Sequence, residues 1–479
     1  MPIRRRCRDR PPVAGSGLTA PSVIAAAAIL CVVGLEPGTE SDLIDRASAI
    51  DMMELASDFG PLPLQVGAIL VFGSGESLAA GEVRDALAGR VCAIPRLRQQ
   101  LVSTPPGCGR PVWADDPEFD VARHVHEIAC SRPGDQDALL RAAAAVMAVP
   151  LPAGQPLWSA TIVTGLAGEA CALIVVFHHV LADGMGGLAV LASLADGAAS
   201  APQQNFPRPK PTARRLAVDA AVSRVRVLAH LGRVPAGVRD ALAELRPGAT
   251  PRAPRCSLNR PVGVRRRLGA VRADLAQVRS AGRAVGGTVN DVVLAAVSGA
   301  LRTQMAGRGE RIDQIVVSVP VSGRAEASPA RLGNQVGVTP VMIPAAGAPL
   351  DRLAAIAEIT RRHKSRTRGA SAALIAPAFR LLAALGMLRW LAERQHLVTC
   401  FVTNLRGPDV PVSFLGAAVC QMIPLVGVAG NVTVAFAVLS YAGTLTVAVM
   451  VDADACPDSG TLIAALQREL DALTTPNRT

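Results

Sequence analysis

Two adjacent histidines, followed by an aspartate and a glycine, form the densest group of chemically active side chains in the sequence. The segment reads His178-His179-Val180-Leu181-Ala182-Asp183-Gly184. A neutral imidazole suits the role of general base, because its unperturbed pKa lies near working pH. Successive strand residues point to opposite faces, so only one of the two rings faces a given site. The segment therefore predicts one catalytic base, as in acyl transfer, and one histidine packed into the scaffold.

Other interpretations of the same residues stay open. A histidine at a strand end is commonly a packing residue, and Asp183 could orient the imidazole, pair with an arginine or cap the next helix. Gly184 permits a positive φ or a close backbone approach. Two histidines and an aspartate could also bind a metal. We expect no metal site, because no other cluster supplies the remaining ligands.

The elements around this segment must place it at the end of a strand. The continuous apolar run 171–177 has the length of a strand buried on both faces, and the run 185–194 predicts a helix. Further strands are expected at 63–72, 157–164, 315–320, 338–343, 398–403, 432–440 and 445–451, further helices at 81–87, 137–147, 216–231, 271–282, 288–305 and 460–473, and irregular structure at 96–120. Because strands and helices interleave in both halves, the chain is predicted to be a two-domain α/β protein.

Composition limits the class of partner. The 479 residues carry a net charge of +11, nearly all of it from arginine, and only 3% are aromatic. Such a charge attracts phosphates or an anionic membrane surface, but the few aromatics disfavour binding of single-stranded nucleic acid. The ten cysteines include no Cys-x-x-Cys pair, which indicates buried free thiols in a reducing compartment.

Shifts in composition divide the chain into four segments. Residues 1–44 combine five arginines with an apolar run, 23–35, that is too short to cross a bilayer. They are either a secretory signal or a mis-assigned translation start, and we expect them to be disordered. Residues 45–198 form a first half with the histidines, 199–267 a Pro- and Arg-rich crossover, and 268–479 a second half.

The histidine segment is the His-His-x-x-x-Asp-Gly signature of CoA-dependent acyltransferases, and the chain resembles one branch of them, the bacterial wax ester synthase/diacylglycerol acyltransferase family. The resemblance runs from about residue 45 to the end of the chain. It is carried by Ser48–Asp51, Gly60–Phe72, Ile94–Gln99, Arg110–Trp113, Asp116–Asp120 with His124, Pro156–Trp158, Val289–Val292, Leu332–Asn334, Thr403–Pro408, and Val451-Asp452 with Pro457-Asp458.

The resemblance implies a chloramphenicol acetyltransferase-like fold with the active site at the interface of the two halves. His179 would be the catalytic base, with His178, Asp183 and Gly184 supporting it. Asn290 and Asp291 would belong to a second-half site, with Asn290 a candidate oxyanion donor. Thr288-x-x-Asp291 is equally a helix-capping pattern.

Other matching positions would line the substrate channel or serve the structure, and we expect Trp158 to pack rather than to touch substrate. They are Pro156, Leu157, Trp158, Asn404, Gly407 and Pro408. The chain departs from the family pattern at Gln65, where a histidine is usual, and at Leu405-Arg406, where smaller residues are usual.

The implied function is an O-acyltransferase that moves a long acyl chain from acyl-CoA to diacylglycerol or to a long-chain alcohol, giving triacylglycerol or wax ester. No cofactor is expected beyond the substrate acyl-CoA. The enzyme is expected to be cytoplasmic and peripherally bound to a membrane or lipid droplet, with no nucleic-acid partner. Two alternatives remain: a condensation-type acyltransferase with a carrier-protein donor, and a lipid-binding or lipid-droplet protein with little turnover.

Overall fold

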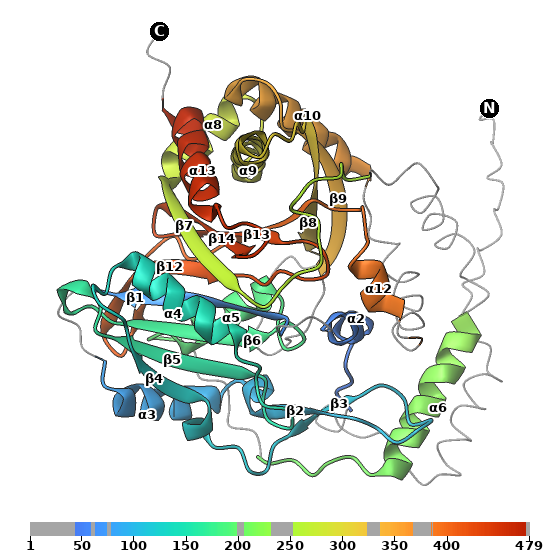
Figure 1. The fold of residues 1–479 in the computed structure, drawn as a ribbon. Coiled ribbons are helices and arrows are strands. Elements are labelled where there is room, and N and C mark those ends of the chain that lie inside the picture. Colours follow the sequence, from blue (N-terminus) through green and yellow to red (C-terminus); the bar gives the residue numbers. More distant parts are fainter. Residues whose placement is uncertain are drawn as a thin grey trace, which may run out of the picture. The chain divides into compact units, whose positions relative to one another are not determined.

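The computed structural model describes residues 44–58, 63–73, 78–198, 206–230, 252–322, 336–366, 385 and 387–475. The expected extension at 1–44 and the matching segment Leu332–Asn334 fall almost wholly outside these ranges. Two six-stranded sheets and a two-stranded ribbon carry the described residues (Figure 1). The mixed α/β architecture agrees with the prediction from the sequence.

The first sheet places the strand that ends at the histidines near its centre. Its order is β11-β12-β1-β6-β5-β4, with β4 parallel to β5 and the other neighbours antiparallel. The strands are β1 Gln65–Phe72, β4 Val125–Ala129, β5 Trp158–Thr164, β6 Ala172–His178, β11 Ser413–Phe414 and β12 Ala417–Leu425. β1 thus pairs with β6 from the first half of the sequence on one edge and with β12 from the second half on the other.

The second sheet has the order β7-β14-β13-β10-β8-β9, and β10 runs parallel to both of its neighbours. Its strands are β7 Arg266–Asp274, β8 Gln314–Ser322, β9 Val336–Pro344, β10 Cys400–Arg406, β13 Val434–Tyr441 and β14 Thr444–Asp452. The ribbon consists of β2 Gln99–Val102 and β3 Val112–Asp115.

Helices cover these sheets. They are α2 Ala49–Ser57, α3 Ala80–Val91, α4 Gln136–Ala148, α5 Gly184–Leu194, α6 Ala213–His230, α8 Leu275–Ala284, α9 Val289–Gly307, α10 Pro349–Arg366, α12 Met387–Ala392 and α13 Ser459–Thr474, with short 3₁₀ turns that include η2 Pro95–Arg98 and η3 Val121–Arg123. Within the described part of the chain, no single helix has the length and hydropathy to cross a membrane, although the bent pair α8–α9 passes both criteria jointly.

Three hydrophobic clusters explain the layering. In β6, Leu173, Val175 and Phe177 face a cluster with α3 and α5, because alternate strand residues point to opposite sides. The residues between them face a second cluster, which joins both sheets and α4. The expected strand 171–177 is thus confirmed, including its burial on both faces.

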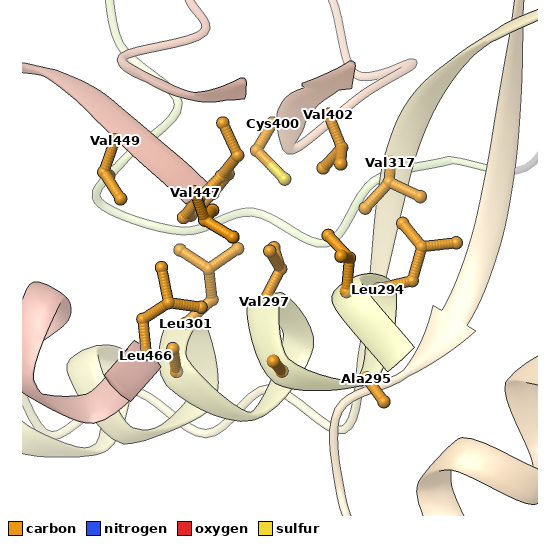
Figure 2. Close-up of a cluster of buried hydrophobic side chains, with 14 of the residues drawn as sticks. Leu294, Ala295, Val297, Leu301, Val317, Cys400, Val402, Val447, Val449 and Leu466 are labelled. Carbon is orange, nitrogen blue, oxygen red and sulfur yellow. The ribbon is translucent and has the colours of Figure 1, made fainter. Parts of the chain in front are cut away.

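The third cluster surrounds α9, which is apolar on nearly every side and is therefore buried. Figure 2 shows its side chains meeting strands of the second sheet and α13. The contacting residues shown there include Leu294, Val297 and Leu301 of α9, Val317 of β8, Val402 of β10, Val447 of β14 and Leu466 of α13.

Two expectations about secondary structure were wrong. The helix expected at 271–282 begins only at Leu275, because residues 266–274 pair along their whole length with β14 as β7. Leu268 and Ala270 face one cluster and Val271 and Ala273 face another, so β7 alternates between two partly apolar faces. The supposedly irregular residues 96–120 contain β2 and β3, each only four residues long and stabilised by pairing with the other.

We predict that Gly67→Ala disrupts the first sheet. An alanine Cβ at this position would lie 2.1 Å from the carbonyl oxygen of Val175, a backbone atom that cannot move without separating β1 from β6. The expected loss of unfolding free energy is at least about 3 kcal/mol. Chemical denaturation measures it, with Gly89→Ala as the control. Gly89 lies in α3 with open space around it, so its replacement should stabilise by about 0.5–1 kcal/mol. Equal effects of both substitutions would contradict the packing argument.

Candidate active site

The backbone of both motif histidines is held by neighbouring strand ends. The His178 amide donates to the Leu157 carbonyl at 3.0 Å, and the His179 amide donates to the Leu64 carbonyl at 3.0 Å. In the β1–β6 register, His178 lies opposite Gln65. The two rings therefore leave the sheet from a rigid frame.

His178 is the histidine on the scaffold side. Only 7% of it is exposed, and its Nδ1 accepts a hydrogen bond from the Val180 amide at 3.1 Å. An accepting Nδ1 leaves the proton on Nε2, which lies 3.0 Å from Oδ2 of Asp58. His178 thus links the end of β6 to the segment that follows α2.

Asp58 is held in its ionised form by this link. Burial alone would raise the pKa of its carboxyl, but hydrogen bonds from His178 and from the Leu64 amide outweigh burial and leave the pKa below its ordinary value. A carboxylate at this position stabilises the proton on Nε2 of His178.

His179 is only half-buried, and its Nδ1 lies 3.6 Å from Oε2 of Glu54. This separation is slightly longer than a hydrogen bond, as catalytic pairs often are before substrate binds. A carboxylate near Nδ1 favours the tautomer protonated there, which leaves Nε2 as the basic nitrogen. The arrangement fits a general base supported by an acidic residue.

Both carboxylates come from α2 and its end. Ser48 and Asp51 cap this helix reciprocally, the Asp51 amide donating to the Ser48 hydroxyl at 2.9 Å and the Ser48 amide to the Asp51 carboxylate at 2.8 Å. Glu54 and Asp58 are four residues apart, so they project from one face. The sequence analysis missed both, although this spacing after a capping box was a usable signal.

Asp183 is the N-cap of α5. Its Oδ1 accepts the Gly186 amide at 2.8 Å, and 2% of the residue is exposed. Asp183 therefore caps the helix, one of the roles left open for it. Gly184 has no positive φ, and it provides a close approach. A Cβ there would lie 2.9 Å from a methyl carbon of Leu405 in β10.

Asp291 and Asn290 differ in what they contact. The Asp291 carboxylate accepts hydrogen bonds from the Thr288 amide at 2.7 Å, the Thr288 hydroxyl at 2.8 Å and the Thr360 hydroxyl at 2.7 Å. It therefore secures the start of α9 to α10. The Asn290 Oδ1 instead lies 3.5 Å from the amide nitrogen of Asn404.

β10 contacts the starts of both α9 and α5. Asn404 is followed by Leu405, whose side chain rests on Gly184 at the start of α5. Asn404 and Leu405 are successive strand residues, so their side chains leave β10 on opposite faces, and only Leu405 contacts the motif. Sequence spacing alone could not have joined these residues.

Trp158 is a packing residue in this structure. It is 1% exposed, its Nε1 donates to the Leu97 carbonyl at 2.8 Å, and its ring stacks on His124 with centroids 4.6 Å apart. Pro156 and Leu157 lie just before it, where the Leu157 carbonyl accepts the His178 amide. This segment positions β5 next to β6.

Gly407 and Pro408 form the turn after β10. The Gly407 amide donates to the Ser440 carbonyl at 2.9 Å, and a Cβ on Gly407 would lie 2.6 Å from that oxygen. The Pro408 carbonyl accepts the Ala442 amide at 3.0 Å. Close backbone approach explains the glycine, and these contacts are structural ones.

The departures from the family pattern occupy different environments. Gln65 is fully buried and donates to the Val149 carbonyl at 2.9 Å. Arg406 is exposed and pairs with Asp409 at 2.8 Å, and hydrogen bonds from Arg406 and Arg279 lower the pKa of Asp409. Arg406 therefore extends toward solvent at the end of β10 instead of entering the neighbourhood of His179.

Cysteine and metal chemistry add no residue to this site. The described cysteines are all free thiols. Among the residues with described positions, no group of three or more His, Cys, Asp or Glu side chains is arranged to hold a metal ion.

We predict that His124 makes folding stability depend on pH. Burial lowers the pKa of its ring, although a hydrogen bond to the Trp158 carbonyl at 2.9 Å partly opposes this. The unfolded chain then binds the proton more readily, so stability present above pH ~6.5 is lost as pH falls toward the lower pKa of the folded state. His124→Asn should flatten this loss between about pH 7 and pH 5 in denaturant titrations. Exposed His396→Asn should keep the wild-type slope, and an unchanged slope in His124→Asn would contradict the assignment.

Comparison with known proteins places this geometry in a family. Residues 47–293 match the wax ester synthase/diacylglycerol acyltransferase catalytic domain, and residues 332–474 match the C-terminal domain of the same family. A probable diacylglycerol O-acyltransferase of Mycobacterium tuberculosis, tgs1, is 32% identical over 84% of this chain and 90% of its own length. A second M. tuberculosis protein, the putative diacylglycerol O-acyltransferase Rv3087, is 28% identical over 80% of this chain and 86% of its own.

Solved structures agree in fold. The wax ester synthase/diacylglycerol acyltransferase from Marinobacter aquaeolei VT8 aligns with a TM-score of 0.64 and 21% identity, covering 90% of this chain and 98% of that one. The first condensation domain of the calcium-dependent antibiotic synthetase aligns with a TM-score of 0.58 and 20% identity, covering 91% and 96%. The fold is the two-domain, chloramphenicol acetyltransferase-like fold of CoA-dependent acyltransferases, and the chain belongs to the wax ester synthase/diacylglycerol acyltransferase family.

Proposed function

We propose that the protein is an O-acyltransferase that transfers a long-chain acyl group from acyl-CoA to the hydroxyl of diacylglycerol or of a long-chain alcohol. The observation that carries the proposal is His179, half-buried at the end of β6 with Glu54 at its Nδ1, in a chain of this family. The donor is a substrate, and the reaction needs no further cofactor in this proposal.

The proposed reaction exchanges a thioester for an oxygen ester. Nε2 of His179 takes the hydroxyl proton as the alcohol oxygen bonds to the thioester carbonyl carbon, a form of catalysis worth about 10²–10⁴-fold. The carbon–sulfur bond then breaks, and the CoA thiolate leaves with the proton from the imidazolium. Glu54 stabilises the imidazolium formed between these steps, because the opposite charge lies near Nδ1.

A negative charge develops on the carbonyl oxygen and needs a hydrogen-bond donor. We assign this role to the Asn290 amide, supported by one contact. Its Oδ1 lies 3.5 Å from the amide nitrogen of Asn404, which leaves the Asn290 amide nitrogen to donate. Asp291 serves as a positioning residue, because its carboxylate is occupied by Thr288 and Thr360.

Association with the surface of a membrane or lipid droplet on the cytoplasmic side completes the proposal. Both proposed acceptors are lipids that reside in such surfaces. The net charge of +11 supports attraction to anionic headgroups.

We predict that His179→Ala lowers kcat by about 10²–10⁴-fold while acyl-CoA binding is retained, because the substitution removes the base. The measurement combines release of free CoA from palmitoyl-CoA with detection of ester, using dioleoylglycerol and hexadecanol as acceptors. His126→Ala is the matched control, since His126 is exposed on β4. Unchanged turnover in His179→Ala would refute the role of His179.

The same assay separates the alternatives. Preference for an acylated carrier protein over palmitoyl-CoA would favour a condensation-type enzyme. Binding of acyl-CoA with no ester formed from any acceptor would favour a lipid-binding protein.

We predict that Gly184→Ala lowers activity by about tenfold or more, because the new methyl meets Leu405 and displaces the start of α5. A smaller partner should relieve the contact, so Gly184→Ala combined with Leu405→Ala should recover much of the activity. A double-mutant cycle on kcat/KM measures this coupling. Additive losses in the double variant would show that the Leu405 contact is not the cause.

A further inference from the structure

α12 and its flanks display large apolar side chains to solvent. We define the α12 patch by its five residues, of which Trp390 is 53% exposed and Leu397 is 51% exposed. The patch consists of Leu385, Met387, Trp390, Leu391 and Leu397. Clustered exposed apolar side chains mark interaction sites, whereas scattered ones do not.

The exposure belongs to an anchored element. Leu388 of α12 is buried, and the Ala392 carbonyl packs so closely on Gly430 that a Cβ there would lie 2.9 Å from it. After the helix, Gln395 and buried Asn431 are joined by hydrogen bonds in both directions. These contacts fix α12 on the protein, so the side chains of the patch remain directed toward solvent.

Arginines lie on and beside the α12 patch. Arg389 and Arg394 lie on or next to α12, and the Arg394 guanidinium is 5.1 Å from the centroid of the Trp390 ring. Exposed Arg252 adjoins Ala253, whose amide donates to the His396 carbonyl at 2.8 Å. Glu393 is the acidic residue within this stretch, and it pairs with Arg389 at 2.7 Å. Tryptophan and aliphatic side chains among arginines match the interface of an anionic lipid layer.

The position of the patch connects it with the candidate active site. α12 contacts α2, and the two helices lie side by side in Figure 1. α2 carries Glu54, and Asp58 ends it, so the same helix borders both motif histidines. A lipid surface at α12 would thus lie beside the helix that carries Glu54, the neighbour of His179.

We propose that the α12 patch is the surface by which this protein rests on an anionic lipid layer, with Trp390 inserted at the headgroup level. The role of this lipid contact in acyl transfer rests on the proposed function. The binding itself requires no turnover, so it is measurable separately.

We predict that Trp390 reports vesicle binding directly. The chain has three tryptophans, and the other two, Trp113 at 5% and Trp158 at 1% exposed, are buried. Vesicles of phosphatidylcholine with phosphatidylglycerol should shift the tryptophan emission to the blue, and brominated lipids should quench it.

Met387→Ser/Trp390→Ser/Leu391→Ser should weaken co-sedimentation with these vesicles by about 100-fold. Arg389→Glu/Arg394→Glu should weaken binding to anionic vesicles by at least about 25-fold, about fivefold for each arginine lost, and should change binding to pure phosphatidylcholine little.

Val264→Ser/Val410→Ser is the matched control, because these valines are at least as exposed but lie outside the patch. It should bind vesicles as the wild type does. Wild-type vesicle binding by the triple serine variant would overturn the proposal, whatever acyl-transfer assays show. Light scattering that finds a wild-type dimer, dissociated by the triple variant while vesicle binding persists, would assign the patch to a second copy and overturn it equally. Loss of vesicle binding with retained turnover of detergent-dispersed substrate would support the patch and leave the proposed function intact.

Discussion

The pairing of β1 between β6 and β12 is the constraint on which the rest of the site depends. β1 forms hydrogen bonds on both edges. One edge pairs with β6, which ends at His178, and the other pairs with β12, which lies more than 300 residues further along the chain. Gly67 permits this pairing because the Val175 carbonyl occupies the space of a side chain. Leu64, just before β1, then fixes the amide of His179. The direction in which the base leaves the sheet is therefore a consequence of sheet register.

Electrostatics divides two chemically identical side chains into different roles. His178 is enclosed, with Nδ1 accepting from the backbone and Nε2 donating to ionised Asp58. His179 is more open and faces Glu54 across a longer gap. The two carboxylates lie one helical turn apart at the end of α2, so a single capped helix carries the acidic neighbours of both rings.

The second sheet contributes through β10. It lies between two parallel partners, and Asn404 and Leu405 contact Asn290 and Gly184 respectively. This strand connects the helix start at α9 with the helix start at α5. Leu405 occupies the space beside Gly184, at one of the positions where the family usually has a smaller residue.

The sequence by itself determined the elements that have strong local signals, and the family. The run 171–177 was readable as a strand because seven successive apolar residues suit burial on both faces, and α9 was readable because its capping pattern and apolar positions agree. The heptapeptide with its surrounding segments identified the acyltransferase family. These signals come from neighbouring residues or from the order of motifs along the chain, so they can be recognised in the sequence alone.

Only the tertiary structure decided which side chains meet. β7 is a strand because β14 lies beside it, and no periodicity within 266–274 records that neighbour. Asp183 is a cap, while the carboxylates near the histidines come from α2, more than a hundred residues earlier. The contacts of Asn290 with Asn404 and of Gly184 with Leu405 likewise join distant segments. Such contacts depend on sheet order and helix placement, which arise from packing of the whole chain and leave no mark in the spacing of residues.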